Sequence, residues 1–135
     1  MRDPQTVVPE ENALMENKKL MGREGESAAA AYLKKKKYRI IGMNYACRLG
    51  EIDLIAENRD SVVFVEVKRR KNARFAEARE FVTKAKQRRL AATASLWLMQ
   101  NPTAKQPRFD VIEVYQTDSA VHSINHIENA FEVEL

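Results

Sequence analysis

The chain has 135 residues, of which 44% are hydrophobic and 31% are charged. This balance is typical of one soluble globular domain and excludes a disordered chain, and no apolar run approaches the roughly 18 residues that a membrane-spanning helix needs. The N-terminus lacks the basic segment and apolar core of a secretory signal, and the lone cysteine, Cys47, excludes an internal disulfide. We therefore expect a reducing compartment such as the cytoplasm.

Positive charge is concentrated in one part of the chain. The net charge is +4, but residues 68–89 contain ten Lys or Arg residues against two Glu residues, and the last twenty residues contain no Lys or Arg. Clustered positive charge of this kind indicates a polyanionic partner. The sequence therefore predicts binding to nucleic acid, with DNA as the expected form and no membrane partner. The alternative is a solvated helix face beside a basic turn.

The N-terminal part of the chain changes character near residue 20. Residues 1–20 mix proline, asparagine, glutamine and charged residues without a sustained period, so we expect a flexible extension there. Residues 21–135 are expected to form a single domain. Its first element is a predicted helix, because Glu26, Ala29 and Leu33 recur at helical spacing and four lysines follow at the C-terminal end, where cations are favourable.

The rest of the chain predicts a sheet with one further helix. Strand patterns cover residues 38–48, 51–58, 61–70, 108–116 and 120–129, the last at the sheet edge. An apolar stripe at helical spacing predicts a helix over residues 77–100. A short polar turn joins the second and third strands, which predicts an antiparallel hairpin. This order predicts an α/β sandwich with a central mixed sheet flanked by helices.

The predicted hairpin carries charged residues within strands of high β-propensity. Because side chains on a strand alternate between two faces, Glu66 and Lys68 share one face of the third strand. In the preceding strand Glu51, Asp53 and Ile55 share a face, opposite Ile52 and Leu54. An antiparallel hairpin can therefore bring Asp53 beside Glu66, although the turn alone does not fix the register.

Two carboxylates held together in a strand interior repel each other and lose hydration. A divalent cation relieves both effects, and oxygen ligands of this kind suit Mg²⁺ or Mn²⁺. Asp53 and Glu66 are therefore candidate metal ligands, and Lys68 is a candidate for positioning an attacking hydroxide or stabilising charge on a phosphorane. The alternative is that these residues line the solvent face of a hairpin.

Two further sets of titratable residues have open roles. Glu26 lies on the apolar stripe of the first predicted helix and should point at the sheet, but a glutamate near a helix start is also stabilised there by the helix dipole. Both readings remain open from the residues alone. His122 and His126 have no cluster of carboxylates or thiols beside them in the sequence, so we expect surface residues rather than metal ligands.

Several motifs resemble one known family. In order, the chain reads GREGESAAAAYLKKKKYRIIGMNY, LGEIDLIAE, VVFVEVKRR, KQRRLAATA and RFDVIEV. At this order and spacing they resemble the YraN-like family of small bacterial proteins, over roughly residues 22–131. That family is similar to archaeal Holliday-junction resolvases and belongs to the PD-(D/E)XK nuclease superfamily. The resemblance implies a restriction-endonuclease-like core, α-β-β-β-α-β, with a three-layer type of sandwich.

The resemblance also implies roles for individual residues. Asp53 matches the metal-binding aspartate of the superfamily, and Glu66 with Lys68 matches the (D/E)XK element. Glu26 matches the glutamate of the GE motif, which favours a place for it as a third metal ligand. Gln87, with the lysine before it, matches the KQ element of the second helix. The catalytic candidates are therefore Asp53, Glu66, Lys68, Glu26 and Gln87.

The chain departs from the family pattern beside the second helix. Where the family usually reads like FGSP, residues 75–78 read Phe-Ala-Glu-Ala, and the loss of Gly and Pro predicts a helix that starts earlier, near Glu77. This difference puts nucleic-acid contacts from that loop in doubt. Leu49 also replaces a common glycine before GEIDLI.

These observations predict a metal-dependent endonuclease-like protein that hydrolyses phosphodiester bonds in DNA with Mg²⁺ or Mn²⁺, with branched or repair-intermediate DNA as candidate substrates. The residues expected to bind nucleic acid are Arg69, Arg70, Lys86, Arg88 and Arg89. One alternative is a non-catalytic nucleic-acid-binding module with a nuclease fold in recombination, repair or DNA uptake. Another is a protein whose basic helix docks an acidic partner. Because resolvases of similar fold act as dimers, a homodimer is an alternative to a monomer.

Overall fold

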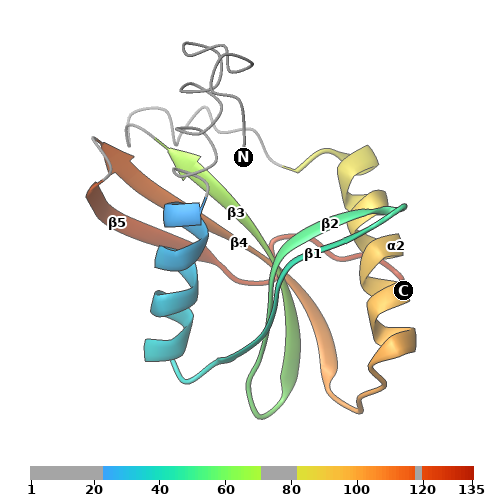
Figure 1. Ribbon diagram of the computed structural model, residues 1–135. Helices are drawn as coiled ribbons and strands as arrows, with labels where there is room; N and C mark the ends of the chain where they lie inside the picture. Colours follow the sequence, from blue (N-terminus) through green and yellow to red (C-terminus); the bar gives the residue numbers. More distant parts are fainter. Residues whose placement is uncertain (1–22, 71–81, 118–119) are drawn as a thin grey trace, which may run out of the picture.

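The computed structural model describes residues 23–70, 82–117 and 120–135. Two helices are present in these ranges, one over residues 23–35 and α2 over Lys84–Gln100. The strands are β1 (Arg39–Cys47), β2 (Gly50–Glu57), β3 (Ser61–Arg70), β4 (Gln106–Thr117) and β5 (Ala120–Ile127). They form one twisted sheet in the order β1-β2-β3-β4-β5 (Figure 1), in which β3 and β4 are parallel and the other neighbours are antiparallel. The predicted α/β class with a mixed sheet and an antiparallel β2–β3 hairpin is therefore confirmed. The first and last residues of each predicted strand lie within two residues of those observed.

The predicted start of the second helix is wrong. Thr83 has extended backbone angles, φ −64° and ψ 159°, and its side chain accepts a hydrogen bond from the N–H of Lys86 at 3.1 Å. This is the geometry of a helix N-cap, so α2 begins at Lys84 rather than near Glu77. Residues 71–81, which include most of the departure from the family pattern, lie outside the described residues, as does the predicted extension over residues 1–20.

The two helices cover opposite faces of the sheet and define two apolar cores. Val63 and Val65 pack in one core with Leu33 of the 23–35 helix, whereas Phe64 packs in the other core with Leu90 of α2. This arrangement confirms the alternation predicted for the third strand and gives a helix–sheet–helix sandwich, consistent with a restriction-endonuclease-like fold. Within the described residues, no helix combines the length and apolar character needed to cross a membrane.

The alternation expected for β2 fails at one point. Leu54 packs in the core under the 23–35 helix, but Ile52 packs in the α2 core together with Ile55, so the prediction that Ile52 and Ile55 face opposite ways is wrong. The pairing of β2 with β3 extends from Glu57 only as far as Leu54, which pairs with Val65, so Asp53 is the first residue beyond it. The strand therefore leaves its regular path next to the candidate site.

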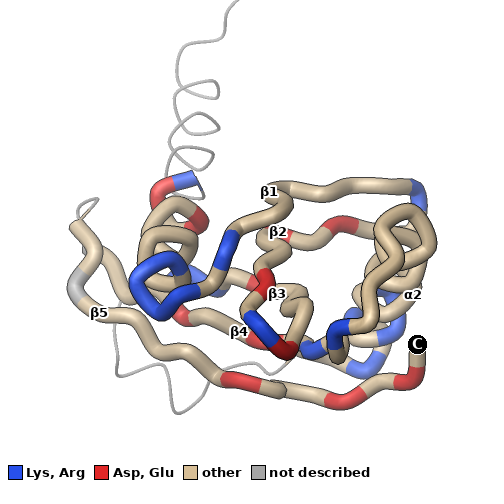
Figure 2. Tube along the Cα trace, turned by 90° about the horizontal axis from the view of Figure 1, so that it is seen from below, with Lys and Arg blue, Asp and Glu red and all other residues tan. Residues whose placement is uncertain are grey.

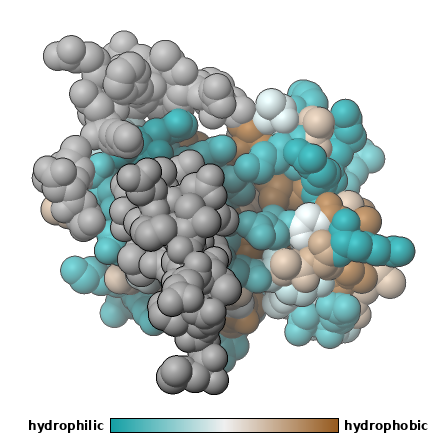
Figure 3. Space-filling view, turned by 45° about the horizontal axis from the view of Figure 1, so that its top comes forward, coloured by the Kyte–Doolittle hydropathy of each residue, from teal (hydrophilic) through white to brown (hydrophobic). Residues whose placement is uncertain are grey.

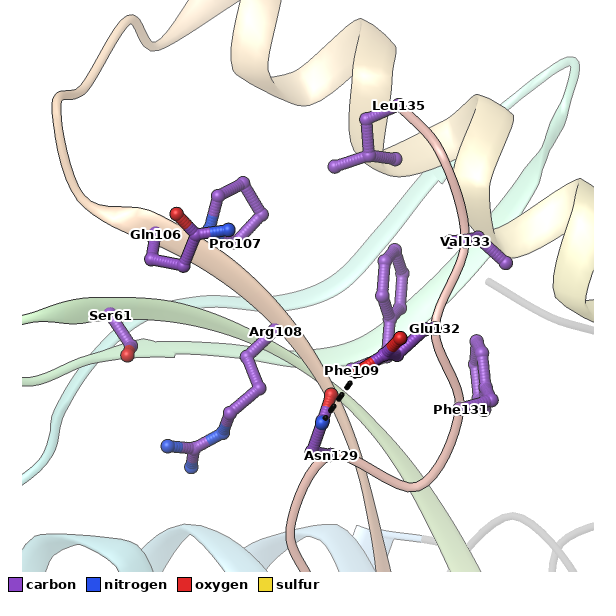
Figure 4. Close-up of a pocket in the computed structure, with 10 residues that line it drawn as sticks. All are labelled: Ser61, Gln106, Pro107, Arg108, Phe109, Asn129, Phe131, Glu132, Val133 and Leu135. Atoms are coloured by element: carbon purple, nitrogen blue, oxygen red, sulfur yellow. Dashed lines mark hydrogen bonds between the residues drawn. The ribbon is translucent and has the colours of Figure 1, made fainter.

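The C-terminal residues pack against the α2 side of the sheet. The ring of Phe131 stacks on that of Phe109, with centroids 5.1 Å apart, and the N–H of Ala130 donates to the carbonyl of Phe109 at 2.8 Å. A cavity of about 700 Å³ lies under this segment and beside the starts of β3 and β4 (Figure 4). It is lined by Ser61, Gln106, Pro107, Arg108, Phe109, Asn129, Phe131, Glu132, Val133 and Leu135. The carboxylates predicted for the site are not among these residues.

A buried polar network joins β4, β5 and the 23–35 helix. Asp110 accepts two hydrogen bonds from Arg108, at 2.8 and 2.7 Å, and lies 2.7 Å from Nε2 of His126. Nδ1 of His126 lies 3.2 Å from the hydroxyl of Tyr32. The side chain of His126 is 3% exposed, so the expectation of a surface histidine is wrong for this residue. The network satisfies buried polar atoms and ties the edge strand β5 to the fold.

Candidate functional site

Asp53 and Glu66 lie at the end of the β2–β3 ladder. The last paired residues are Leu54 and Val65, and the carboxylate of Asp53 then accepts a hydrogen bond from the backbone N–H of Val67 at 2.8 Å. The aspartate side chain therefore takes a backbone donor of β3 and is held beside Glu66. The sequence could not fix this register, and the structure supplies it.

The carboxyl group of Asp53 is difficult to ionise in this position. Its pKa is raised to about 7, first because burial removes it from water and second because the Glu66 carboxylate repels it. The hydrogen bond from the N–H of Val67 acts in the opposite direction and is outweighed. Both the protonated and the ionised form of Asp53 are therefore populated near neutral pH, and a nearby cation would favour the ionised form.

Two lysines approach the Glu66 carboxylate from different elements. Nζ of Lys86, in the first turn of α2, lies 2.6 Å from Oε1 of Glu66, and Nζ of Lys68, on β3, lies 3.8 Å from the same oxygen. Only 10% of the Glu66 side chain is exposed, compared with 26% for Lys68 and 36% for Lys86. The glutamate is therefore the most buried member of this group, and the two lysines are more accessible to solvent.

Asp53, Glu66 and Lys86 open into a cavity of about 240 Å³ between the β1–β2 hairpin and α2. Its lining residues are Gly50, Glu51, Asp53, Glu66, Lys86, Arg89 and Leu90. Gly50 allows the hairpin to approach α2 closely, because its φ is +152° and a Cβ at this position would lie 2.9 Å from Oγ1 of Thr93. The cavity therefore combines three carboxylates with two cationic side chains.

Glu26 lies beside this group but is held by a different partner. In the amide orientation that satisfies both groups, the nitrogen of Asn44 donates to the two carboxylate oxygens of Glu26 at 2.8 and 3.1 Å. Burial raises the pKa of Glu26, while the Asn44 hydrogen bond lowers it. The charge of Glu26 also contributes to the raised pKa of Asp53, so the two carboxylates are close enough to interact.

The structure does not assemble the complete predicted metal-ligand set. In the described ranges, no group of three His, Cys, Asp or Glu side chains is arranged to hold a metal ion. Asp53 and Glu66 are brought together, whereas Glu26 is engaged by Asn44 at the side. Two carboxylates still fit the predicted ion, because Mg²⁺ usually keeps several waters and needs only one or two protein carboxylates.

Gln87 is not directed at the carboxylates. Its amide nitrogen donates to the backbone carbonyl of Val82 at 2.8 Å, just before α2 begins. The neighbouring Lys86 takes the position beside Glu66. The lysine shares the face of α2 with Leu90, four residues later, which also lines the cavity.

The predicted nucleic-acid-binding residues are spread over several surfaces. Lys86 and Arg89 line the cavity, and Arg88 is exposed on α2. The side chain of Arg69 passes close to Gly25 of the 23–35 helix, and Arg70 pairs with the fully buried Glu113 at 3.2 Å. Figure 2 shows basic positions gathered on α2, and a second group at the end of the 23–35 helix, where Lys34–Lys37 lie. On the described surface around α2, hydrophilic side chains are interspersed with apolar ones (Figure 3).

Three residues near the site are absent from the predicted site residues, although the strand pattern put Glu51 on the same face as Asp53. Glu51 adds a carboxylate to the cavity, Asn44 holds Glu26, and Glu113 holds Arg70. Asn44 has a φ of +52°, a left-handed conformation in the middle of β1 that asparagine adopts more readily than most residues. The only signal for it was an asparagine within a strand pattern. Glu113 could have been suspected, because a glutamate in the apolar run of β4 needs a buried partner.

The fold and the strand-borne carboxylates define an α/β protein with a restriction-endonuclease-like sandwich. The chain belongs to the family described as "Uncharacterised protein family UPF0102", whose family model matches residues 25–114. A UPF0102 protein of Geotalea uraniireducens is 42% identical over 116 residues, which cover 85% of this chain and 91% of the relative. UPF0102 proteins of Caldanaerobacter subterraneus and Alkaliphilus oremlandii are 44% and 46% identical, each over 118 residues covering 85% of this chain and 97% and 99% of the relatives. The expected membership of the YraN-like family is thereby confirmed, and the names of these relatives state no activity.

Proposed function

We propose that this protein is a divalent-metal-dependent endonuclease that hydrolyses phosphodiester bonds in DNA. The observation that carries the proposal is the pairing of Asp53 and Glu66 at one end of a cavity that is also lined by basic side chains. Buried like charges are unfavourable unless a cation or a proton compensates them, and such arrangements concentrate at functional sites.

Mg²⁺ or Mn²⁺ fits the chemistry of these ligands, with Asp53 and Glu66 as the residues that would hold it and Glu26 as a third candidate at the margin. A bound ion of this kind lowers the pKa of a water molecule and polarises a phosphate oxygen. Both carboxylates are hard oxygen donors and leave room in the coordination shell for water and phosphate.

The cationic residues of the site have separate parts in this proposal. Lys68 lies on the same strand as Glu66 and would orient an attacking hydroxide or stabilise the negative charge of a phosphorane. Lys86, Arg88 and Arg89 present positive charge along α2, where they would bind the phosphates on either side of the reacting bond. Contacts to phosphates carry no sequence information, so we propose cleavage without strong sequence specificity.

Cleavage assays test this function directly. Junction, flap, single-stranded and duplex DNA are incubated with wild type and with Asp53→Asn in Mg²⁺ and in Mn²⁺. Asparagine keeps the size and the acceptor for the N–H of Val67 but removes the ligand charge. We expect cleavage by wild type and at least a hundredfold loss in the variant. Equal background cleavage by both proteins would refute the proposal.

A second candidate function is a nucleic-acid-binding module that performs no chemistry. It is favoured by one observation: Lys86 forms an ion pair with Glu66 at 2.6 Å, so the chain itself supplies a counter-charge for this carboxylate. DNA binding by wild type with no detectable Mg²⁺ or Mn²⁺ binding in a calorimetric titration would support this function. Under both proposals the partner is DNA and the compartment is the cytoplasm, and a homodimer is tested by sedimentation with and without DNA.

A further inference from the structure

Lys86 lies where a cation neutralises the carboxylates of the candidate site. Its Nζ is 2.6 Å from Oε1 of Glu66, much nearer than the 3.8 Å that separate Nζ of Lys68 from the same oxygen. Because only 10% of the Glu66 side chain is exposed, water screens this carboxylate poorly. The Lys86 ammonium is therefore the principal counter-ion of Glu66 among the described residues.

The backbone of Lys86 is held in place, whereas its side chain can change conformation. The backbone N–H of Lys86 donates to the side chain of Thr83, which fixes the first turn of α2. The side chain is 36% exposed, and its ammonium group is carried on a flexible four-carbon stem. The ammonium can therefore leave Glu66 without a movement of the helix. Glu66 belongs to β3, on the opposite wall of the cavity.

A metal ion and the Lys86 ammonium would compete for the same carboxylate, because Lys86 already contacts Oε1 of Glu66. A carboxylate oxygen that holds a divalent ion at bonding distance cannot keep an ammonium 2.6 Å away without strong repulsion between the two positive charges. Arg89 lines the same cavity and adds to this repulsion. Metal binding at Glu66 therefore requires that Lys86 move away.

We infer that Lys86 is a built-in counter-ion of Glu66 that a divalent metal ion must displace, and that the displaced ammonium then serves to bind a substrate phosphate. This inference rests on the proposed function and adds a mode of regulation to its metal site. In this inference, Lys86 contacts Glu66 in the metal-free state and releases it in the metal-loaded state. It also explains why a lysine, which is a mobile point charge, occupies this position on α2.

The affinity for Mn²⁺ alone tests the exchange without any cleavage assay. The free ion is measured by electron paramagnetic resonance in wild type, in Lys86→Met and in Lys84→Met, which removes the same charge from an exposed position in the same turn of α2. Removing the competing ammonium should tighten Mn²⁺ binding by about three- to tenfold in Lys86→Met, the range set by a partly exposed ion pair. Lys84→Met should bind as wild type does.

A second measurement uses the unmodified protein and so does not depend on the folding of a variant. The ¹⁵N resonance of the Lys86 ammonium is followed by NMR as diamagnetic Mg²⁺ is added. We expect this resonance to shift, and its exchange with water to accelerate, at the Mg²⁺ concentrations that saturate the site, while the Lys84 resonance stays constant.

The outcomes separate this inference from the proposed function. If wild type binds Mn²⁺ and Lys86→Met binds it equally or more weakly, or if saturating Mg²⁺ leaves the Lys86 resonance unchanged, the exchange is overturned and the metal site stands. If neither wild type nor Lys86→Met binds Mn²⁺, the proposed metal-dependent function fails and the exchange fails with it.

Discussion

The carboxylate of Asp53 accepts the backbone N–H of Val67 at 2.8 Å, where the ladder between β2 and β3 has ended. This single hydrogen bond holds an acidic side chain across the hairpin and beside Glu66. The fold therefore keeps two carboxylates together although burial and the charge of Glu66 oppose the ionisation of Asp53.

The first prediction concerns the pH dependence of stability. The pKa of Asp53 rises from 3.8 to about 7 on folding, so between these values the folded protein binds more protons than the unfolded chain. The contribution of Asp53 is fully favourable below about pH 4 and is lost as the pH rises through 7. We therefore expect Asp53→Asn to gain about 2–4 kcal/mol relative to wild type between pH 4 and pH 8, measured by urea unfolding without metal. A difference that stays constant with pH would show that the carboxyl group is ionised normally.

A second prediction separates the two roles of Asn44. Its φ of +52° favours glycine or asparagine, and its amide bonds Glu26. We expect Asn44→Ala to be less stable than Asn44→Gly by about 1 kcal/mol, because only alanine is strained in the left-handed region. In both variants the pKa of Glu26 should rise further, since the hydrogen bond that lowers it is lost. Chemical denaturation and ¹³C NMR of the Glu26 carboxyl group check the two parts, and equal stability of the variants would contradict the first.

The close approach at Gly50 gives a third prediction. A Cβ there combines an unfavourable φ of +152° with a 2.9 Å contact to Oγ1 of Thr93. Gly50→Ala should cost about 2 kcal/mol of unfolding free energy, and adding Thr93→Ala should relieve the contact but not the backbone strain. A double-mutant cycle measures this coupling. Strictly additive effects would mean that Gly50 and Thr93 do not press on each other.

A fourth prediction concerns the buried network on β4. Asp110 lies in contact with Arg108 and His126, and these partners hold its pKa below the usual value in spite of burial. Its stabilising contribution is therefore present above about pH 4 and is lost as the pH falls through the lowered pKa. Asp110→Asn should cost about 2–3 kcal/mol at pH 7, because Arg108 loses its counter-charge. This cost should shrink as the pH falls through the lowered pKa of Asp110, where the wild-type carboxyl group also loses its charge. Thermal unfolding across this range is the measurement, and a cost that persists unchanged in acid would contradict the account.

The parts of the fold that depend on local pattern could be predicted from the sequence. The run from Val62 to Val65 is apolar on both faces and is bounded by a polar turn, so β3 and its hairpin with β2 were evident. The start of α2 was not evident, because Thr83 has no glutamate three residues later to mark it as a cap.

The details of the site depend on tertiary contacts that no local pattern contains. Lys86 rather than Gln87 meets Glu66 because the rotation of α2 is set by packing, although extending the stripe of Leu90 back by four residues points to Lys86. The burial of His126 could not be predicted from its own surroundings in the sequence, because its partner Asp110 lies 16 residues away, on the neighbouring strand. The hydrogen bonds between Glu26 and Asn44 could not be predicted either, because Asn44 lies on β1, a different element of the chain.

The most direct test of the central claim is the position of Mn²⁺ in crystals soaked with the ion, located by anomalous scattering. We expect one peak bound by both Asp53 and Glu66, with the Lys86 ammonium no longer in contact with Glu66. We also expect Asp53→Asn crystals to lose this peak. A saturating soak that shows no ion between these carboxylates, with Lys86 still on Glu66, would contradict the metal site on which the proposed nuclease activity depends.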